Sequence, residues 1–217
     1  MKKDANAISI IDGADGPTSV FILKRNSKLT LKQKIEKIKH KIKRTYVEKT
    51  LKPESHTIDE VIEYIVNVHG FIELDKDSDE VKEEYNQMRA SCIMQHDPKL
   101  LGEYADIPPL KSESMEDVKA HLEQVQKRMQ KALEIPNTEF AIDFHKFQKL
   151  FGDINDNIYI VIEKRFAYIG GGATGNKKVI KRFHHIYKDI YRYYGVTRED
   201  IRTKSERYKD VVRTLSQ

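Results

Sequence analysis

The order of the apolar patterns along the chain constrains the fold more than any other feature of the sequence. Strand-like patterns occur in two places, at residues 8–23 and 139–169, and helical periodicities fill the chain between and after them. A doubly wound sheet requires strands and helices to alternate, and no such alternation runs along this chain. We therefore predict an α+β fold in which about four mostly antiparallel strands, one pair from each place, pack with about six helices.

Size and composition narrow the class of protein. With 217 residues, 39% of them hydrophobic, the chain can bury one sizeable core. No apolar run approaches the roughly 18 residues that cross a bilayer, and the first 11 residues lack the apolar segment of a signal peptide. The single cysteine, Cys92, excludes an intramolecular disulfide and a multi-cysteine metal site. We expect a soluble, cytoplasmic protein that carries no cofactor.

The charge is concentrated in blocks, although the formal net charge is only +5. Residues 24–52 hold 12 Lys and Arg against 2 Asp and Glu, and residues 171–217 hold 12 against 5. Residues 53–170, by contrast, hold 13 basic and 24 acidic residues. Either the two basic blocks fold back on the acidic middle of the same molecule, or they offer a basic face to phosphates or to an acidic partner.

The chain divides into three expected parts. A strand–loop–strand motif occupies residues 1–27, a basic amphipathic helix residues 28–52, and an α+β body residues 53–217, which forms one domain with the N-terminal pair. Within the body, Thr57 and Glu60 have the spacing of a capping box. Further helices are expected at about residues 57–70, 79–97, 115–133 and 176–194, with a last one after Thr197.

The helix expected at residues 30–51 is the most basic part of the chain. Its apolar residues recur at three- and four-residue steps and form one narrow stripe: Leu31, Ile35, Ile38, Ile42 and Tyr46. Its basic face carries Lys34, Lys37, Lys41, Lys43 and Arg44. The pattern is typical of contact with a nucleic-acid backbone, an anionic membrane surface or an acidic partner groove, and also of a solvated face. The single arginine argues against base-specific readout, and the absence of tryptophan argues against membrane insertion.

The segment IIDGADGPTSVFI, residues 10–22, is the most distinctive string in the chain. It resembles the motif of the beta subunit of sodium-ion-translocating decarboxylases, in which a GGADGPT segment forms part of the intramembrane ion path. Asp12 stands where that motif has its first glycine. The matching positions are Gly13, Ala14, Asp15, Gly16, Pro17 and Thr18, within a likeness that covers about 15 of 217 residues.

The resemblance implies a sodium site at Asp15, because the aspartate of the family's motif is associated with sodium and proton coupling. It also implies an accessory or truncated relative of that sodium transport system, in contact with the membrane decarboxylase complex. The residues by themselves predict a hairpin, in which aspartates form Asx-turns and glycines adopt positive φ. Such a hairpin would place Asp15 in bulk water, whereas the family's carboxylate lies at membrane depth.

A second glycine-rich segment, GGGATG at residues 170–175, follows a strand-like pattern and precedes a helical one. Its spacing satisfies the dinucleotide fingerprint, but no second parallel strand and no ribose-binding acid follow, and Asn176 stands where a phosphate-binding loop has lysine. Exposed amides at the start of the helix could still bind a phosphate-like anion, or the segment is a flexible glycine turn. The candidate residues are Gly171, Gly172, Thr174, Gly175, Lys177 and Lys178.

No other pattern predicts catalysis. The eight histidines are scattered, and the adjacent His184 and His185 point in different directions on a helix. Cys92 lies on an apolar stripe, which is typical of a core residue rather than of a nucleophile. We expect a non-enzymatic binding protein that engages an anionic partner, an acidic protein or a nucleic-acid backbone, with its N-terminal hairpin and basic helices. An enzyme that binds a phosphorylated ligand at GGGATG is a further alternative.

Overall fold

A computed structural model describes residues 6–13, 16–24, 30–110, 112 and 114–217 of the chain. This part contains eight helices and antiparallel sheets, which confirms the α+β fold class. It divides into two compact units, residues 1–28 with 75–143 and residues 29–74 with 144–217. The basic helix belongs to the second unit, together with the C-terminal part of the chain.

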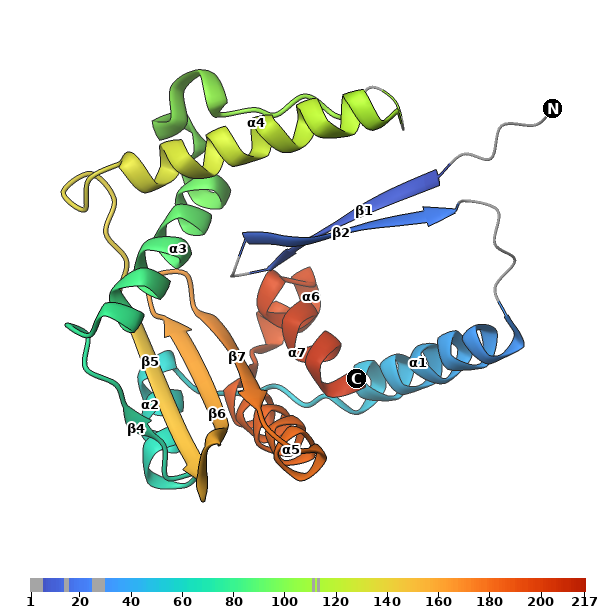
Figure 1. The fold of residues 1–217 in the computed structure, drawn as a ribbon. Helices are drawn as coiled ribbons and strands as arrows, with labels where there is room; N and C mark the ends of the chain where they lie inside the picture. The colour runs from blue at the N-terminus through green and yellow to red at the C-terminus, as the bar shows by residue number, and fades with distance from the viewer. Residues whose placement is uncertain (1–5, 14–15, 25–29, 111, 113) are drawn as a thin grey trace. The chain divides into compact units, whose positions relative to one another are not determined.

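Figure 1 shows the elements along the chain. The helices are α1 (Leu31–Thr50), α2 (Ile58–Asn67), α3 (Asp79–His96), the short 3₁₀ helix η1 (Pro98–Tyr104), α4 (Met115–Glu134), α5 (Lys177–Tyr194), α6 (Arg198–Thr203) and α7 (Glu206–Ser216). The strands are β1 (Asn6–Gly13), β2 (Gly16–Lys24), β3 (Glu54–Ser55), β4 (Ile72–Glu73), β5 (Phe144–Phe151), β6 (Asp153–Glu163), β7 (Tyr168–Thr174) and β8 (Gly195–Val196). The single helix expected after Thr197 is two helices, because Lys204 adopts a left-handed conformation and Ser205 caps a new start.

The first unit contains the hairpin β1–β2 and the helices α3, η1 and α4. The hairpin is antiparallel, as the sequence predicts, and forms a two-stranded sheet of its own rather than part of a larger one. Helices α3 and α4 begin at the serine caps Ser78 and Ser114. Cys92 is buried on α3, in agreement with its assignment to a core. Arg89 is also buried, and it donates a hydrogen bond of 2.5 Å to the carbonyl of Ile135, just after α4.

The second unit is built on an antiparallel sheet in the order β4–β5–β6–β7. Helix α5 packs on β6 and β7, while α2 and α7 pack against α5. The core of this unit combines sheet and helix residues. Ile160 and Ile162 of β6 are fully buried in it together with Ile190 of α5 and Ile65 of α2. Helix α1 contacts α7, and its C-terminal residues Val47 and Leu51 reach the same core.

The glycine segment 170–175 differs from the expected turn, because its first five residues belong to β7 and pair with β6. A Cβ atom on Gly171 would lie 2.6 Å from the carbonyl oxygen of Tyr159, and one on Gly172 would lie 2.6 Å from the Tyr159 hydroxyl. The glycines therefore allow β7 to approach β6 and the Tyr159 side chain closely. The strands β5 and β6 are joined at Gly152 alone, where φ is +84°.

Candidate functional site

Helix α1 is a regular helix with a defined start. The hydroxyl of Thr30 accepts a hydrogen bond from the backbone N–H of Gln33 at 3.3 Å, and the Gln33 amide oxygen accepts one from the N–H of Thr30 at 2.9 Å. This reciprocal capping box satisfies two of the donors that a helix start leaves unpaired. The helix then runs for 20 residues, and the chain leaves it through the extended residue Leu51.

Two faces of α1 have opposite surroundings. Glu36, His40, Lys43 and Val47 recur at three- and four-residue steps; the first three line a pocket beside Gln217, and Val47 packs against the core. The residues of this face follow those of the apolar stripe by five positions, which corresponds to a rotation of about 140° around the helix axis. The stripe therefore points away from the body of its unit. Its members Leu31, Ile35, Ile38, Ile42 and Tyr46 are 45–76% exposed.

The five basic candidates of α1 are all exposed, and the structure separates them by their contacts. Lys43 donates a hydrogen bond of 2.8 Å to the backbone oxygen of Gln217, and Arg44 forms an ion pair of 3.0 Å with Glu48 of the same helix. Within the described part of the chain, Lys34, Lys37 and Lys41 have no carboxylate at ion-pair distance. These three lysines are consequently available to a partner.

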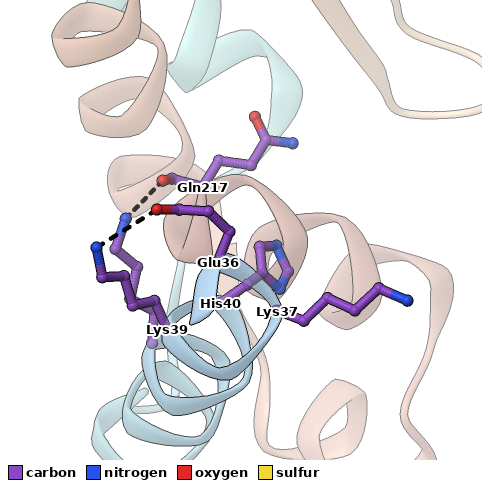
Figure 2. Close-up of a pocket in the computed structure, with 6 residues that line it drawn as sticks. Glu36, Lys37, Lys39, His40 and Gln217 are labelled. Carbon is purple, nitrogen blue, oxygen red and sulfur yellow. Dashed lines mark hydrogen bonds and ion pairs between the residues drawn. The ribbon is translucent and has the colours of Figure 1, made fainter. Parts of the chain in front are cut away.

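A shallow pocket of about 380 Å³ lies between α1 and Gln217 (Figure 2). Lys39 forms an ion pair of 3.4 Å with Glu36 there, and Figure 2 shows Lys37 extending away from that pair. Three lysines and one glutamate give the pocket an excess of positive charge and of hydrogen-bond donors. Its lining consists of Glu36, Lys37, Lys39, His40, Lys43 and Gln217.

Helix α5 supplies a second basic face in the same unit. Its apolar half is buried on the sheet, and its other half exposes Lys177, Lys178, Lys181, Arg182 and Arg192. Burial lowers the pKa of Lys188 on this helix, and the charges of Lys43 and Arg192 lower it further. Lys43 of α1 and Lys188 of α5 therefore lie close enough to repel each other. The charge of Lys43 on α1 thus acts on Lys188 of α5, although the two helices are far apart in the sequence.

The expected anion site at the start of α5 is filled by side chains of the protein. The Asn176 amide oxygen accepts hydrogen bonds from the N–H groups of Lys178, at 2.8 Å, and Val179, at 3.4 Å. The Asp156 carboxylate accepts from the Asn176 backbone N–H at 3.1 Å and from its side-chain amide at 2.7 Å. Gly175, with φ +134°, leaves room for this carboxylate, since a Cβ would lie 2.2 Å from it. A negative group thus already occupies the helix start.

The remaining anion-site candidates are not brought together around a common point. Gly171 and Gly172 lie inside β7, Thr174 ends that strand, and Lys177 and Lys178 are exposed in the first turn of α5. The lysines oppose the helix dipole, and the Asp156 carboxylate offsets their charge. The geometry therefore gives more support to a structural role of this segment than to a phosphate cradle.

Asp15, which the resemblance implies as a sodium ligand, lies outside the described residues. Gly13 and Gly16 are the paired ends of β1 and β2. Over residues 6–13, 16–24, 30–110, 112 and 114–217, no group of three or more His, Cys, Asp or Glu side chains could hold a metal ion.

Sequence patterns did not reveal a cluster of rings and a carboxylate between α2 and α5. The Tyr64 hydroxyl donates a hydrogen bond of 2.6 Å to Asp189, and the Tyr64 ring stacks on Tyr193, with 4.1 Å between centroids. His56 stacks on the other face of Tyr193 at 3.8 Å, and the His69 ring meets the Tyr64 ring edge-on. No sequence signal could have found this cluster, because Asp189 lies 125 residues from Tyr64.

Two members of the cluster have shifted pKa values. The hydrogen bond to Asp189, with burial and the Asp189 charge, raises the pKa of Tyr64 to about 12. Burial lowers the pKa of His69, although the nearby Asp189 opposes this effect. The His69 Nε2 atom lies 3.2 Å from the Asp189 carboxylate without the alignment of a hydrogen bond. A neutral tyrosine and a neutral histidine around one carboxylate form a structural contact between α2 and α5.

The fold and the exposed helix define a class of protein: an α+β chain with a basic amphipathic helix whose apolar stripe faces outward. Within its described residues, the structure has no helix that is long and apolar enough to cross a membrane. No family model, no curated protein and no solved structure matches this chain. The resemblance to the decarboxylase beta subunit thus stays confined to the short segment at residues 10–22.

Proposed function

We propose that this chain is a non-enzymatic binding protein that engages an anionic partner with the basic helices α1 and α5. The observation that carries the proposal is the exposure of α1: every side chain from residue 30 to residue 46 is exposed, although the helix belongs to a compact unit. A helix that served the fold alone would bury its apolar stripe. Exposure of both the stripe and the lysines supports a role in binding.

The electrostatics favour an anion as the partner. Residues 31–50 hold seven lysines and one arginine against two glutamates, and α5 of the same unit repeats the excess of positive charge. Positive charges that repel one another, such as Lys43 and Lys188, raise the energy of the unbound surface. An anionic partner relieves this repulsion, which gives binding a strong dependence on salt concentration.

A heparin column tests the proposal, because heparin is a polyanion without base edges or apolar surface. The K37E/K41E variant is compared with K119E/K127E, whose exposed lysines lie on α4 of the other unit. Each double variant lowers the formal net charge of +5 by four, because each Lys→Glu change removes two charges. We expect K37E/K41E to elute at clearly lower salt than the control. Equal elution of the two variants would show that net charge alone, rather than α1, governs binding.

A further inference from the structure

Positive charge does not account for the apolar stripe of α1. A helix that makes only ionic contacts gains nothing from five large apolar side chains on one line. The stripe spans about 80° of the helix and, from Leu31 to Tyr46, about 22 Å along its axis. It lies on the side of α1 that faces away from the body of the unit. Its partner must therefore offer apolar surface together with negative charge.

We propose that α1 lies flat on an anionic lipid surface, with the apolar stripe inserted between the headgroups and the lysines in contact with phosphates. This inference rests on the proposed function and specifies its partner. The lysines have the required arrangement, because they flank the stripe on both sides: Lys32 and Lys39 on one, Lys34 and Lys41 on the other. Lysines in these positions can extend to the headgroups while the stripe is buried. The absence of tryptophan counts against insertion, but five apolar side chains that are 45–76% exposed supply the apolar surface that insertion needs.

The acidic residues of α1 agree with this orientation. At 100° per residue, Glu36 and Glu48 both lie about 120° from the centre of the stripe, on the half of the helix that would face away from lipid. Each also has a basic neighbour, at 3.4 Å for Lys39 and at 3.0 Å for Arg44. No carboxylate of α1 would therefore meet the negative surface.

Two other occupants fit less well. A second copy of α1 would place two helices of net charge +6 side by side, and their flanking lysines would repel each other. An acidic protein groove would have to be held mainly by the five stripe residues, because Val47 and Lys43 on the opposite face contact the protein itself. Stable protein interfaces bury about 800 Å² on each partner, with about 20–30 residues. A flat lipid surface needs contact only with the half of α1 that faces away from the protein.

The test uses the full chain and a fluorescent reporter. The sequence contains no tryptophan, so the Y46W variant carries a single one on the stripe, where Tyr46 is 68% exposed. The L150W variant places a control reporter on β5, at a position that is 53% exposed. With vesicles of phosphatidylcholine and phosphatidylserine, we expect a blue shift of tryptophan emission for Y46W and none for L150W. Vesicles of phosphatidylcholine alone should give a much smaller shift.

Co-sedimentation with the same vesicles separates insertion from charge. In the I38Q/I42Q variant the stripe becomes polar while glutamine preserves the helix. The control I72Q/L150Q removes two exposed apolar side chains of β4 and β5 in the same unit. We expect I38Q/I42Q to weaken vesicle binding by roughly tenfold per isoleucine, as the loss of apolar burial requires, and the control to bind normally.

Each result decides between the hypotheses. If I38Q/I42Q sediments with the anionic vesicles like the unmodified chain, binding is purely electrostatic and the lipid inference is wrong. If the chain binds heparin through Lys37 and Lys41 but ignores both vesicle types, the proposed function stands and the lipid surface is excluded as partner. Stripe-dependent binding to poly-L-glutamate without vesicle binding would assign the stripe to an acidic protein instead. Loss of heparin discrimination between the lysine variants would overturn the proposed function itself.

Discussion

Helices α1 and α5 have the same kind of sequence but differ in how much of their surface the fold buries. Both are basic and amphipathic, with 20 and 18 residues, and both belong to the same compact unit. Helix α5 buries its apolar half on β6 and β7, and Ile190 in its C-terminal half is fully buried. Helix α1 buries none of its residues and leaves its stripe exposed.

The width of the apolar face explains the difference. Helix α5 has nine apolar or aromatic residues spread over about half of its circumference, which is enough to cover a sheet. The stripe of α1 covers about 80°, and Val47, which does reach the core, lies on the opposite side of the helix. A narrow stripe therefore indicates a helix whose apolar side chains are free to serve an interface, whereas a wide face indicates a core helix.

The largest expected effect comes from equal truncations in the two helices. Ile190→Ala should lower the free energy of unfolding by about 2–5 kcal/mol, because it leaves a cavity in the core. Ile38→Ala, at a position that is 59% exposed, should change it by less than about 0.5 kcal/mol. Urea denaturation followed by circular dichroism measures both values. Similar losses in the two variants would mean that the stripe is buried in solution and would break the comparison.

The same contrast shows how far the sequence could predict this structure. Periodicity located α1, α2, α3, α4 and α5 to within a few residues, and the capping box of Thr57 and Glu60 marked the start of α2, because such signals act locally. The sequence also predicted the stripe and the lysines of α1. It could not predict that the stripe stays exposed, because that depends on which side of α1 meets the core and Gln217, and only the tertiary fold decides this.

The structure of residues 170–175 differs from the expected turn for a related reason. Local chemistry favours a turn at residues 170–175, since glycine adopts conformations that strands rarely need. The fold instead places Gly171 and Gly172 against the Tyr159 residue of β6, a contact between strands that no local pattern encodes. The Asp156 carboxylate at the start of α5 is equally non-local, because it comes from β6. Long-range contacts thus decided both of these features.

The two helices also end differently, so a substitution at the end of α5 provides a second test of the comparison. Helix α1 ends at the ordinary extended residue Leu51, whereas α5 ends at Gly195, with φ +58° and ψ −160°. A Cβ on Gly195 would lie 1.9 Å from the carbonyl oxygen of Glu54 in β3. Gly195→Ala should therefore cost about 2–4 kcal/mol of stability, from backbone strain and the displacement of β3.

Gly152→Ala is the matched control for this substitution. Gly152 also has a positive φ, +84°, but a Cβ there would meet no atom within 4 Å. Its cost should be limited to the conformational strain of about 1 kcal/mol. Thermal denaturation of the two variants separates strain from collision. Equal losses would show that the contact between Gly195 and Glu54 does not fix the end of α5.

The caps of the two helices should differ less strongly. Asn176→Ala removes the acceptor for Lys178 and Val179 and the amide that donates to Asp156, so it should lower stability by about 1 kcal/mol. Thr30→Ala removes a comparable cap, but the first turns of α1 bury nothing, so only the helix end should fray. Urea denaturation reports the first effect and amide hydrogen exchange the second. Global destabilisation by Thr30→Ala would indicate that α1 is coupled to the core along its whole length.

The smallest effect concerns the contact of α5 with α2 and depends on pH. Burial lowers the pKa of His69 from its usual 6.5, so the unfolded chain takes up a proton that the folded chain resists. This contribution is fully present above pH 6.5 and is lost as the pH falls below it. His69→Gln should therefore reduce the loss of stability between pH 7.5 and pH 5.5, as urea denaturation at the two pH values measures. An identical pH profile for His69→Gln and the unmodified chain would mean that the Asp189 charge fully offsets the effect of burial on the His69 pKa. The contact of α5 with α2 would then contribute nothing to the pH dependence of stability.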